Sequence, residues 1–264
     1  MNKTVKQITD ELQAGIKDLF NSETMQLYLK TASKFHTYSA NNVMLIMKQM
    51  PDATLVAGYR TWQTKFNRHV LRGAKGIKIL APIVVKNDLD DEKVIRSFRI
   101  THVFDVSQTQ GDPLPIIPIH ELRGSLSNFT EFKNKLIKIS KYPIYFRDTD
   151  GTMRGYFDIV KLEIVINPGM SEEQTIKTMI HEIAHSRLHN TVELLCSINK
   201  QRREIEAESV AYTVCSYFGI DTSDYSFGYL AGWGKLNTTE TLQQSLTIIQ
   251  ETASSIIDDI ENLV

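Results

Sequence analysis

The segment His181-Glu182-Ile183-Ala184-His185 constrains this chain more than any other, because it places two imidazoles around a carboxylate within five residues. Residues four apart in a helix lie one above the other, so His181 and His185 project from one face and can share an ion. Zinc suits two neutral imidazoles and a carboxylate in a tetrahedral site that leaves a fourth position for water. Glu182 then stands where a general base is needed. The motif predicts a metal centre on a helix.

The sequence around the motif predicts the elements that carry it. Ser171 with Gln174 three positions later fits a capping box, so a helix is expected to begin there and to end near Asn190. Three short strands are expected before this helix, at residues 142–147, 156–159 and 162–167. A second helix is expected at about 203–218, with Gly219 as its stop.

The second helix offers three acids for the third ligand. Glu204 and Glu208 are one turn apart and share a face, whereas Glu206 points about 160° away. We assign Glu204 to the metal and Glu208 to a hydrogen bond with a histidine, and we expect Glu206 to be solvated. The reverse assignment, or a plain charged surface, stays open. Tyr212 continues the face and could donate to a developing oxyanion or simply pack beside the site.

The charge distribution predicts a second function in the first part of the chain. Residues 1–82 hold twelve Lys or Arg against five Asp or Glu, although the whole chain has a net charge of -1. No acid occurs from Ala53 to Asn87, and aromatic residues lie among the cations. Cations neutralise phosphates and aromatic rings stack on bases, so single-stranded nucleic acid fits this segment. A solvated basic surface with its aromatics in the core fits almost as well. The candidate contacts are Arg60, Trp62, Lys65, Arg68, Arg72, Lys75 and Lys78.

These patterns predict an α+β protein of two domains. Helical periodicity occurs at 5–20 and 42–49, strand-like segments at 54–56, 77–85 and 98–106, and a long final helix at 239–263. The prolines after Asp112 indicate a linker at 112–125 between a mixed domain, 1–111, and a second domain, 126–264, with a small sheet and the helix that carries the motif. Short apolar runs, the lack of an export signal and two cysteines lead us to expect a cytoplasmic protein without a membrane partner.

The second half resembles a known family. The strand Leu162-Glu163-Ile164-Val165-Ile166, the HEIAH segment and Glu204-Ile205-Glu206-Ala207-Glu208 look like gluzincin-type metallopeptidases of the ImmA/IrrE group. The resemblance implies a zincin-like metallopeptidase domain over residues 126–264, with Glu204 as the third ligand. It also implies that strand 162–166 is a sheet edge to which an extended peptide could add. Glu208 stands where this family often has Asn or Asp.

The first half resembles the single-stranded-DNA-binding domain of ArdC-type proteins. The resemblance rests on segments 38–46, 58–63, 72–76 and 101–109, which occur here in the same order, with Ala74 in place of a common Glu. Such domains occur in antirestriction and conjugation-associated proteins of mobile elements, before a metallopeptidase-like domain. The resemblance implies a zinc-containing protein that binds incoming single-stranded DNA non-specifically and protects it.

Two other hypotheses about the function stay open. In the first, the protein is a zinc endopeptidase that cleaves a regulatory protein of a mobile element. In the second, zinc only holds the fold. Structural zinc sites normally have four protein ligands, and the sequence offers three, which favours an open site.

Overall fold

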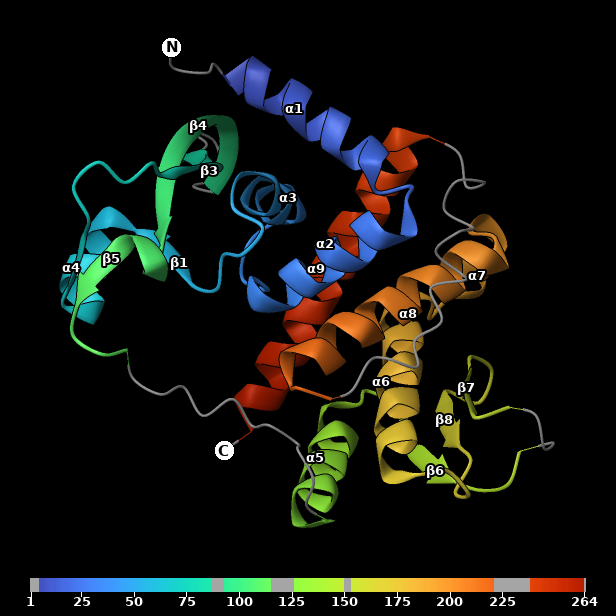
Figure 1. Cartoon of the computed structure of the whole chain (residues 1–264). Coiled ribbons are helices and arrows are strands. Elements are labelled where there is room, and N and C mark those ends of the chain that lie inside the picture. Colours follow the sequence, from blue (N-terminus) through green and yellow to red (C-terminus); the bar gives the residue numbers. More distant parts are fainter. Residues whose placement is uncertain (1–4, 87–92, 115–125, 150–152, 221–237, 264) are drawn as a thin grey trace. The chain divides into compact units, whose positions relative to one another are not determined.

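The computed structural model describes residues 5–86, 93–114, 126–149, 153–220 and 238–263. Their helices and strands confirm the predicted α+β class (Figure 1). The chain forms two compact units that alternate along the sequence. The first unit holds Met1–Leu19 and Tyr38–Ile117, and the second holds Phe20–Thr37 and Pro118–Val264. Within the described ranges, no helix combines the length and apolar character needed to cross a membrane.

The segment 20–37 groups with the second unit and not with the rest of residues 1–111. It was expected in the first domain, 1–111, but its helix α2 (Ser22–Lys34) packs in the second unit against α8 (Lys200–Tyr217). The physical reason is the apolar face of α2, whose residues Met25, Tyr28 and Leu29 have no exposed surface. Most of the predicted linker, residues 115–125, lies outside the described residues.

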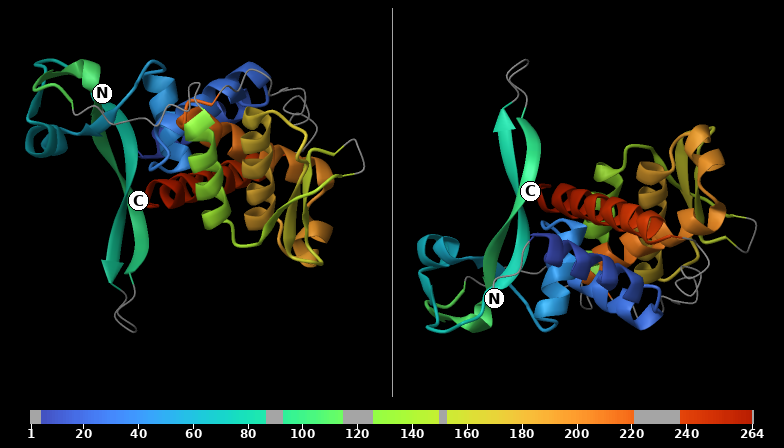
Figure 2. Two further views of the ribbon diagram at one scale, coloured as in Figure 1. Left: turned by 90° about the horizontal axis from the view of Figure 1, so that it is seen from below. Right: turned by 90° about the horizontal axis from the view of Figure 1, so that it is seen from above.

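The first unit is built on a three-stranded antiparallel sheet in the order β1 (Val56–Gly58), β4 (Lys93–Asp105), β3 (Ile77–Lys86). The helices α1 (Val5–Asp18) and α3 (Ala40–Gln49) pack together, and α3 also packs against β3. Strands β3 and β4 continue beyond β1 as a long twisted hairpin (Figure 2). Its register shifts at Ile83 and Val84.

Two side-chain amides of α3 cover part of the outer edge of β3. The Asn42 amide donates to Leu80 O and accepts from Leu80 N, both at 2.9 Å. The Gln49 amide does the same with Lys78, at 2.8 and 2.9 Å. Each amide therefore replaces the backbone group of a missing neighbouring strand, which satisfies an edge that would otherwise attract other chains.

Asp105 and Trp62 hold the loop-rich side of this unit together. It contains α4 (Tyr59–Phe66), the short 3₁₀ helix Val106–Gln108 and the antiparallel pair β2 (Arg68–Val70) and β5 (Thr109–Gly111). The buried Asp105 carboxylate accepts from the backbone N–H groups of Thr54, Leu55 and Ser107 at 2.8, 3.1 and 3.0 Å. The Trp62 indole donates to Phe104 O at 2.8 Å.

The second unit packs helices against a three-stranded sheet. The strands β6 (Ile144–Phe146), β7 (Gly155–Asp158) and β8 (Glu163–Ile166) follow α5 (Leu126–Ile139). Helix α6 (Glu172–Leu188) contacts β7 and β8 as well as α8, and α8 also contacts α9 (Thr239–Glu261). The short helix α7 (Val192–Ser197) connects α6 to α8. Helix α6 therefore lies between the sheet and α8.

The sheet order corrects one expectation. Strand β8 was expected to be an edge, but the order is β6-β8-β7, so β8 lies in the centre. It pairs in parallel with β6 and antiparallel with β7. The reason is the reversal of the chain between Asp158 and Glu163, which folds β7 back onto β8. The strand that ends the sheet beside α6 is β7.

Candidate metal centre

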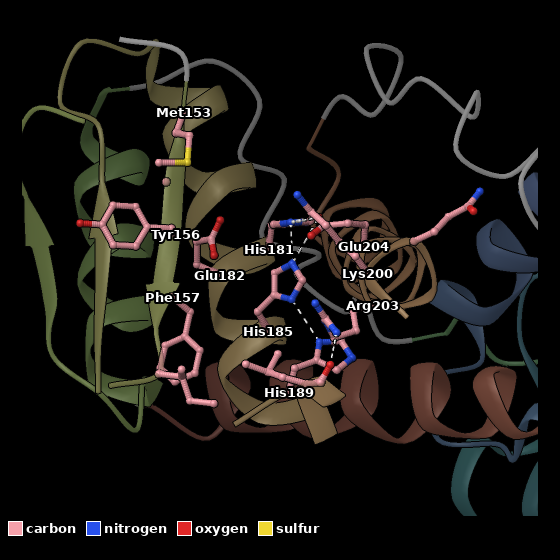
Figure 3. Close-up of a pocket in the computed structure, with 14 residues that line it drawn as sticks. Met153, Tyr156, Phe157, His181, Glu182, His185, His189, Lys200, Arg203 and Glu204 are labelled. Atoms are coloured by element: carbon pink, nitrogen blue, oxygen red, sulfur yellow. Dashed lines mark hydrogen bonds and ion pairs between the residues drawn. The ribbon is translucent and has the colours of Figure 1, made fainter. Parts of the chain in front are cut away.

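Helix α6 begins where the capping pattern predicted. Ser171 Oγ accepts a hydrogen bond from Gln174 N at 3.2 Å, and the helix ends at Leu188 with His189 as its C-cap. Buried Met179, Ile180 and Ile183 fix the rotation of the helix. The imidazoles of the motif consequently face α8, while Glu182 lies on the side of Tyr156 and Phe157 (Figure 3).

Three side-chain atoms converge between α6 and α8. His181 Nε2 lies 3.1 Å from His185 Nε2, and the two nitrogens lie 3.6 and 3.5 Å from Glu204 Oε2. All three ligand atoms are within 4.8 Å of one another. Two imidazole nitrogens and one carboxylate oxygen at this spacing fit the donor set of a divalent transition metal. The structure thus brings together the three residues that the sequence assigned to the metal.

The charges of the site are arranged around His181. Burial lowers the pKa of the His181 imidazole, but contacts with Glu204 and Glu208 outweigh burial and raise it to about 10. Glu208 Oε2 lies 3.1 Å from His181 Nδ1, so the two side chains form an ion pair, whereas a hydrogen bond was expected from the sequence. The two imidazoles hold the pKa of Glu204 well below its ordinary value. Burial lowers the pKa of His185.

Glu182 has the environment of a base that works near neutral pH. Its side chain is buried, and burial raises the pKa of its carboxyl to about 7. The positive charge of His181 and the backbone N–H of Phe157 act in the opposite direction. Glu182 lines a cavity of about 730 Å³ together with His181, His185, Glu204 and residues of β7. A carboxyl with this pKa can take up and release a proton at neutral pH.

Glu206 is not solvated, contrary to the expectation from helical rotation. Its side chain is only 1% exposed, and Oε2 lies 3.3 Å from His189 Nε2. The other oxygen, Oε1, accepts from Arg202 Nε at 2.8 Å and from Ser245 Oγ at 2.6 Å. The expectation was wrong because α8 is covered by α2, α6 and α9, so more than one of its faces is buried.

His189 is a site residue that sequence reasoning missed. Its side chain is 2% exposed, and its Nδ1 lies 3.1 Å from His185 Nδ1. The signal in the sequence was the spacing of four between His185 and His189, which repeats the spacing of the motif itself. Tyr212 is 4% exposed and is not among the residues that line the cavity, because it lies one further turn along α8.

The seven candidate nucleic-acid contacts differ in how far they are exposed to solvent. Arg60, Lys65, Arg72 and Lys75 are exposed, whereas Lys78 is half-buried. The Arg68 guanidinium donates to Thr109 Oγ1 at 2.8 Å and to Thr109 O at 3.0 Å, so it joins β2 to β5. Trp62 is fully buried, so the expectation that it stacks on bases is wrong. The neighbouring Tyr59 is 51% exposed instead.

Two protein-family models match this chain, one in each half. Residues 1–106 match the N-terminal domain of the anti-restriction factor ArdC, and residues 136–224 match the IrrE N-terminal-like domain of the M78 peptidases. The chain joins an ArdC-type domain to an IrrE-like M78 domain. The ArdC-type domain contains α3, α4 and the β3–β4 hairpin, and the M78 domain contains α6 and α8 with the metal centre residues.

Known proteins with the same fold include an antirestriction protein. The chain is similar to the crystal structures of antirestriction ArdC from the R388 plasmid, with TM-scores of 0.56 for the metal-free and 0.55 for the Mn(II)-bound structure. Each is 18% identical and covers 86% of both chains, a level that establishes the fold alone. The chain is also 28% identical over 310 positions to an uncharacterized Bacillus anthracis protein, pXO2-81, and spans about half of its length.

Proposed function

We propose that the ArdC-type domain binds single-stranded DNA without sequence preference and protects DNA that a mobile element transfers, while the M78 domain holds a zinc ion. The observation that carries the DNA-binding part is the acid-free segment 53–87, from which four cations project into solvent. Exposed cations without neighbouring acids attract phosphates at any sequence. The antirestriction role rests on the family match and on the R388 protein of the same fold.

The proposed DNA contacts are the exposed residues of this segment. Arg60 and Lys65 belong to α4, and Arg72 and Lys75 belong to the turn that connects β2 to β3. Tyr59, whose ring meets Phe104 edge to face at 6.3 Å, supplies an exposed aromatic surface for stacking in place of Trp62. Lys78 remains a candidate at the base of the hairpin, and Arg68 serves the structure of the β2–β5 pair.

A salt titration tests the DNA-binding part. Fluorescence anisotropy of labelled (dT)30 should show log affinity falling linearly with log salt, by about 0.7 per phosphate contact. The double variant Arg72→Gln/Lys75→Gln should weaken binding and reduce this slope by about 1.4. Lys138→Gln, an exposed lysine on α5, is the matched control and should change neither. A slope that is flat, or equal in the double variant and the control, would refute the proposal.

The metal part of the proposal rests on His181, His185 and Glu204. Two imidazoles and one carboxylate suit zinc, but such ligands also accept other divalent ions, and the R388 structure of the same fold is titled as Mn(II)-bound. Metal analysis of the purified protein should find one equivalent of zinc, and His181→Ala should lose it. Equal metal content in the wild type and in His181→Ala would place the ion elsewhere.

A second candidate function, zinc-dependent cleavage of a regulatory protein, is favoured by Glu182 and β7. A divalent ion bound there would polarise a carbonyl and lower the pKa of water. Glu182 would hold the proton at its carboxylate and pass it to the leaving amine. Strand β7 ends the sheet and lines the cavity with Tyr156 and Phe157, so an extended peptide could add there rather than at β8.

Glu182→Gln separates the two functions, because it keeps the size of the side chain and removes its basicity. If hydrolysis is dispensable, transferred DNA stays protected from restriction in cells that carry this variant. Loss of protection with normal DNA affinity and normal metal content would favour the peptidase. Arg72→Gln/Lys75→Gln provides the complementary control, since it should reduce protection through DNA binding alone.

A further inference from the structure

We propose that His189 and Glu206 are positioning residues that set the tautomer of His185, so that the lone pair of His185 Nε2 faces the metal position. This inference rests on the proposed metal centre and adds two residues to it. Neither residue supplies one of the three converging ligand atoms, and both act through His185.

The proposal starts from an unbroken series of polar contacts that leads away from the centre. His185 Nδ1 meets His189 Nδ1 at 3.1 Å, and His189 Nε2 meets Glu206 Oε2 at 3.3 Å. The series ends at Arg202 Nε and Ser245 Oγ, which both donate to Glu206 Oε1. It joins the end of α6 to α8 and α9. His189 and Glu206 are 2% and 1% exposed, so water does not compete for these contacts.

The chemistry of the last members fixes the direction of every hydrogen bond when His189 carries one hydrogen. An ionised carboxylate only accepts, and the Arg202 guanidinium beside Glu206 favours the ionised form. The hydrogen between His189 and Glu206 therefore sits on His189 Nε2. A neutral imidazole has one donor and one acceptor, so His189 Nδ1 accepts. His185 Nδ1 must then carry the other hydrogen.

The consequence for the centre is that His185 Nε2 has no hydrogen and presents its lone pair. This is the nitrogen that lies 3.1 Å from His181 Nε2 and 3.5 Å from Glu204 Oε2. A histidine ligand binds a metal through such an unprotonated nitrogen, and the hydrogen bond at the other nitrogen selects it. Glu206 thus acts on the metal centre through the imidazoles of His189 and His185.

The direct test is the position of the imidazole hydrogens in the metal-free wild type. Long-range proton–nitrogen NMR correlation at pH 8 should find the hydrogen of His185 on Nδ1 and that of His189 on Nε2. The opposite arrangement at either ring would overturn the proposal. This measurement needs no bound metal, so it remains decisive if the proposed metal centre fails.

Glu206→Gln tests the effect on metal binding. Arg202 and Ser245 hold the amide oxygen at the position of Oε1, so the amide NH₂ faces His189 and reverses the series, which moves the hydrogen of His185 onto Nε2. We expect affinity for Zn²⁺ and Mn²⁺, measured by competition with a chromophoric chelator, to fall by about 10- to 100-fold. Glu251→Gln, the same change at an exposed acid of α9, is the matched control, with affinity expected within about 2-fold of wild type.

The outcomes distinguish this inference from the proposed function. If the wild type binds no metal at the centre, the metal part of the proposed function fails. The NMR measurement still tests the tautomers of His185 and His189. If the wild type binds metal and folded Glu206→Gln binds equally well, the positioning role is wrong and the series only supports helix packing. Circular dichroism establishes that the variant is folded, and the wild-type NMR measurement decides if it is not.

Discussion

Replacing Asp105 by Asn should strongly destabilise the ArdC-type domain, because one buried carboxylate serves three backbone N–H groups. Its Oδ2 accepts from Thr54 and Leu55, and its Oδ1 accepts from Ser107. A hydrogen bond to a charged group contributes about 1.5–3 kcal/mol, against about 0.5–1.5 kcal/mol for a neutral one. The Asn amide keeps one acceptor and turns an NH₂ toward the other donor. We therefore expect a loss of about 2–4 kcal/mol in the free energy of unfolding.

The same carboxylate makes the effect depend on pH. Burial by itself raises the pKa of Asp105, but the three backbone N–H groups outweigh burial and hold it below the ordinary value. A lowered folded-state pKa gives stability that is present above the unfolded pKa of about 4 and is lost as pH falls through the folded pKa. The difference between the wild type and Asp105→Asn should be constant from pH 7 to about 5 and shrink below about pH 4.

Urea unfolding followed by tryptophan fluorescence measures this difference. The chain has two tryptophans, so Trp233→Phe leaves Trp62 as the reporter of the ArdC-type domain. Asp52→Asn, an exposed acid of the same unit, is the control and should stay within about 0.5 kcal/mol of the parent. A loss below about 1 kcal/mol for Asp105→Asn, or one that does not shrink in acid, would refute the reasoning.

Three further predictions concern packing and the metal. Trp62→Phe removes the donor to Phe104 O and should cost about 2 kcal/mol in urea unfolding, while (dT)30 affinity of the folded protein stays unchanged; weaker DNA binding would restore Trp62 as a contact. Gly111→Ala should cost more than about 1 kcal/mol, since its φ is 148° and the new Cβ would lie 2.4 Å from Asn67 O; an unchanged melting curve would contradict this. A divalent ion at 100 times its Kd should stabilise the wild type by about 2.7 kcal/mol, and a similar gain in Glu204→Gln would argue against the centre.

The sequence predicted best where local signals decide the structure. The capping pattern at Ser171 located the start of α6, and the four-residue spacing of His181 and His185 placed both imidazoles beside Glu204. These features depend on the geometry of single helices, which residues within a few positions determine. Helix α4 was not predicted because it has only eight residues and buries only Trp62, although Tyr59, Trp62 and Phe66 have helical spacing.

The incorrect predictions concern properties that only the packed unit determines. Helical rotation separates Glu206 from Glu204 and Glu208, but whether that direction meets water depends on α2 and α9, which are distant in sequence. Strand β8 was recognised, yet its central place depends on pairing with both β6 and β7. The basic composition of segment 53–87 likewise led to the prediction that Trp62 stacks on bases. The hydrogen bond from its indole to Phe104 O shows instead that the ring belongs to the core.

The alternation of the two units along the chain limits how the protein can be dissected. A fragment that starts after residue 111 contains α8 but not α2, and a fragment that ends at 111 carries α2 without the surface that it covers. Removing the contacts of Met25, Tyr28 and Leu29 takes away about 5–9 kcal/mol of apolar burial, which is comparable to the whole stability of an ordinary domain. A truncated M78 domain is therefore expected to unfold, whatever the metal centre does in the full chain. Expressing it alone requires a design in which residues 20–37 are supplied separately or grafted onto its start.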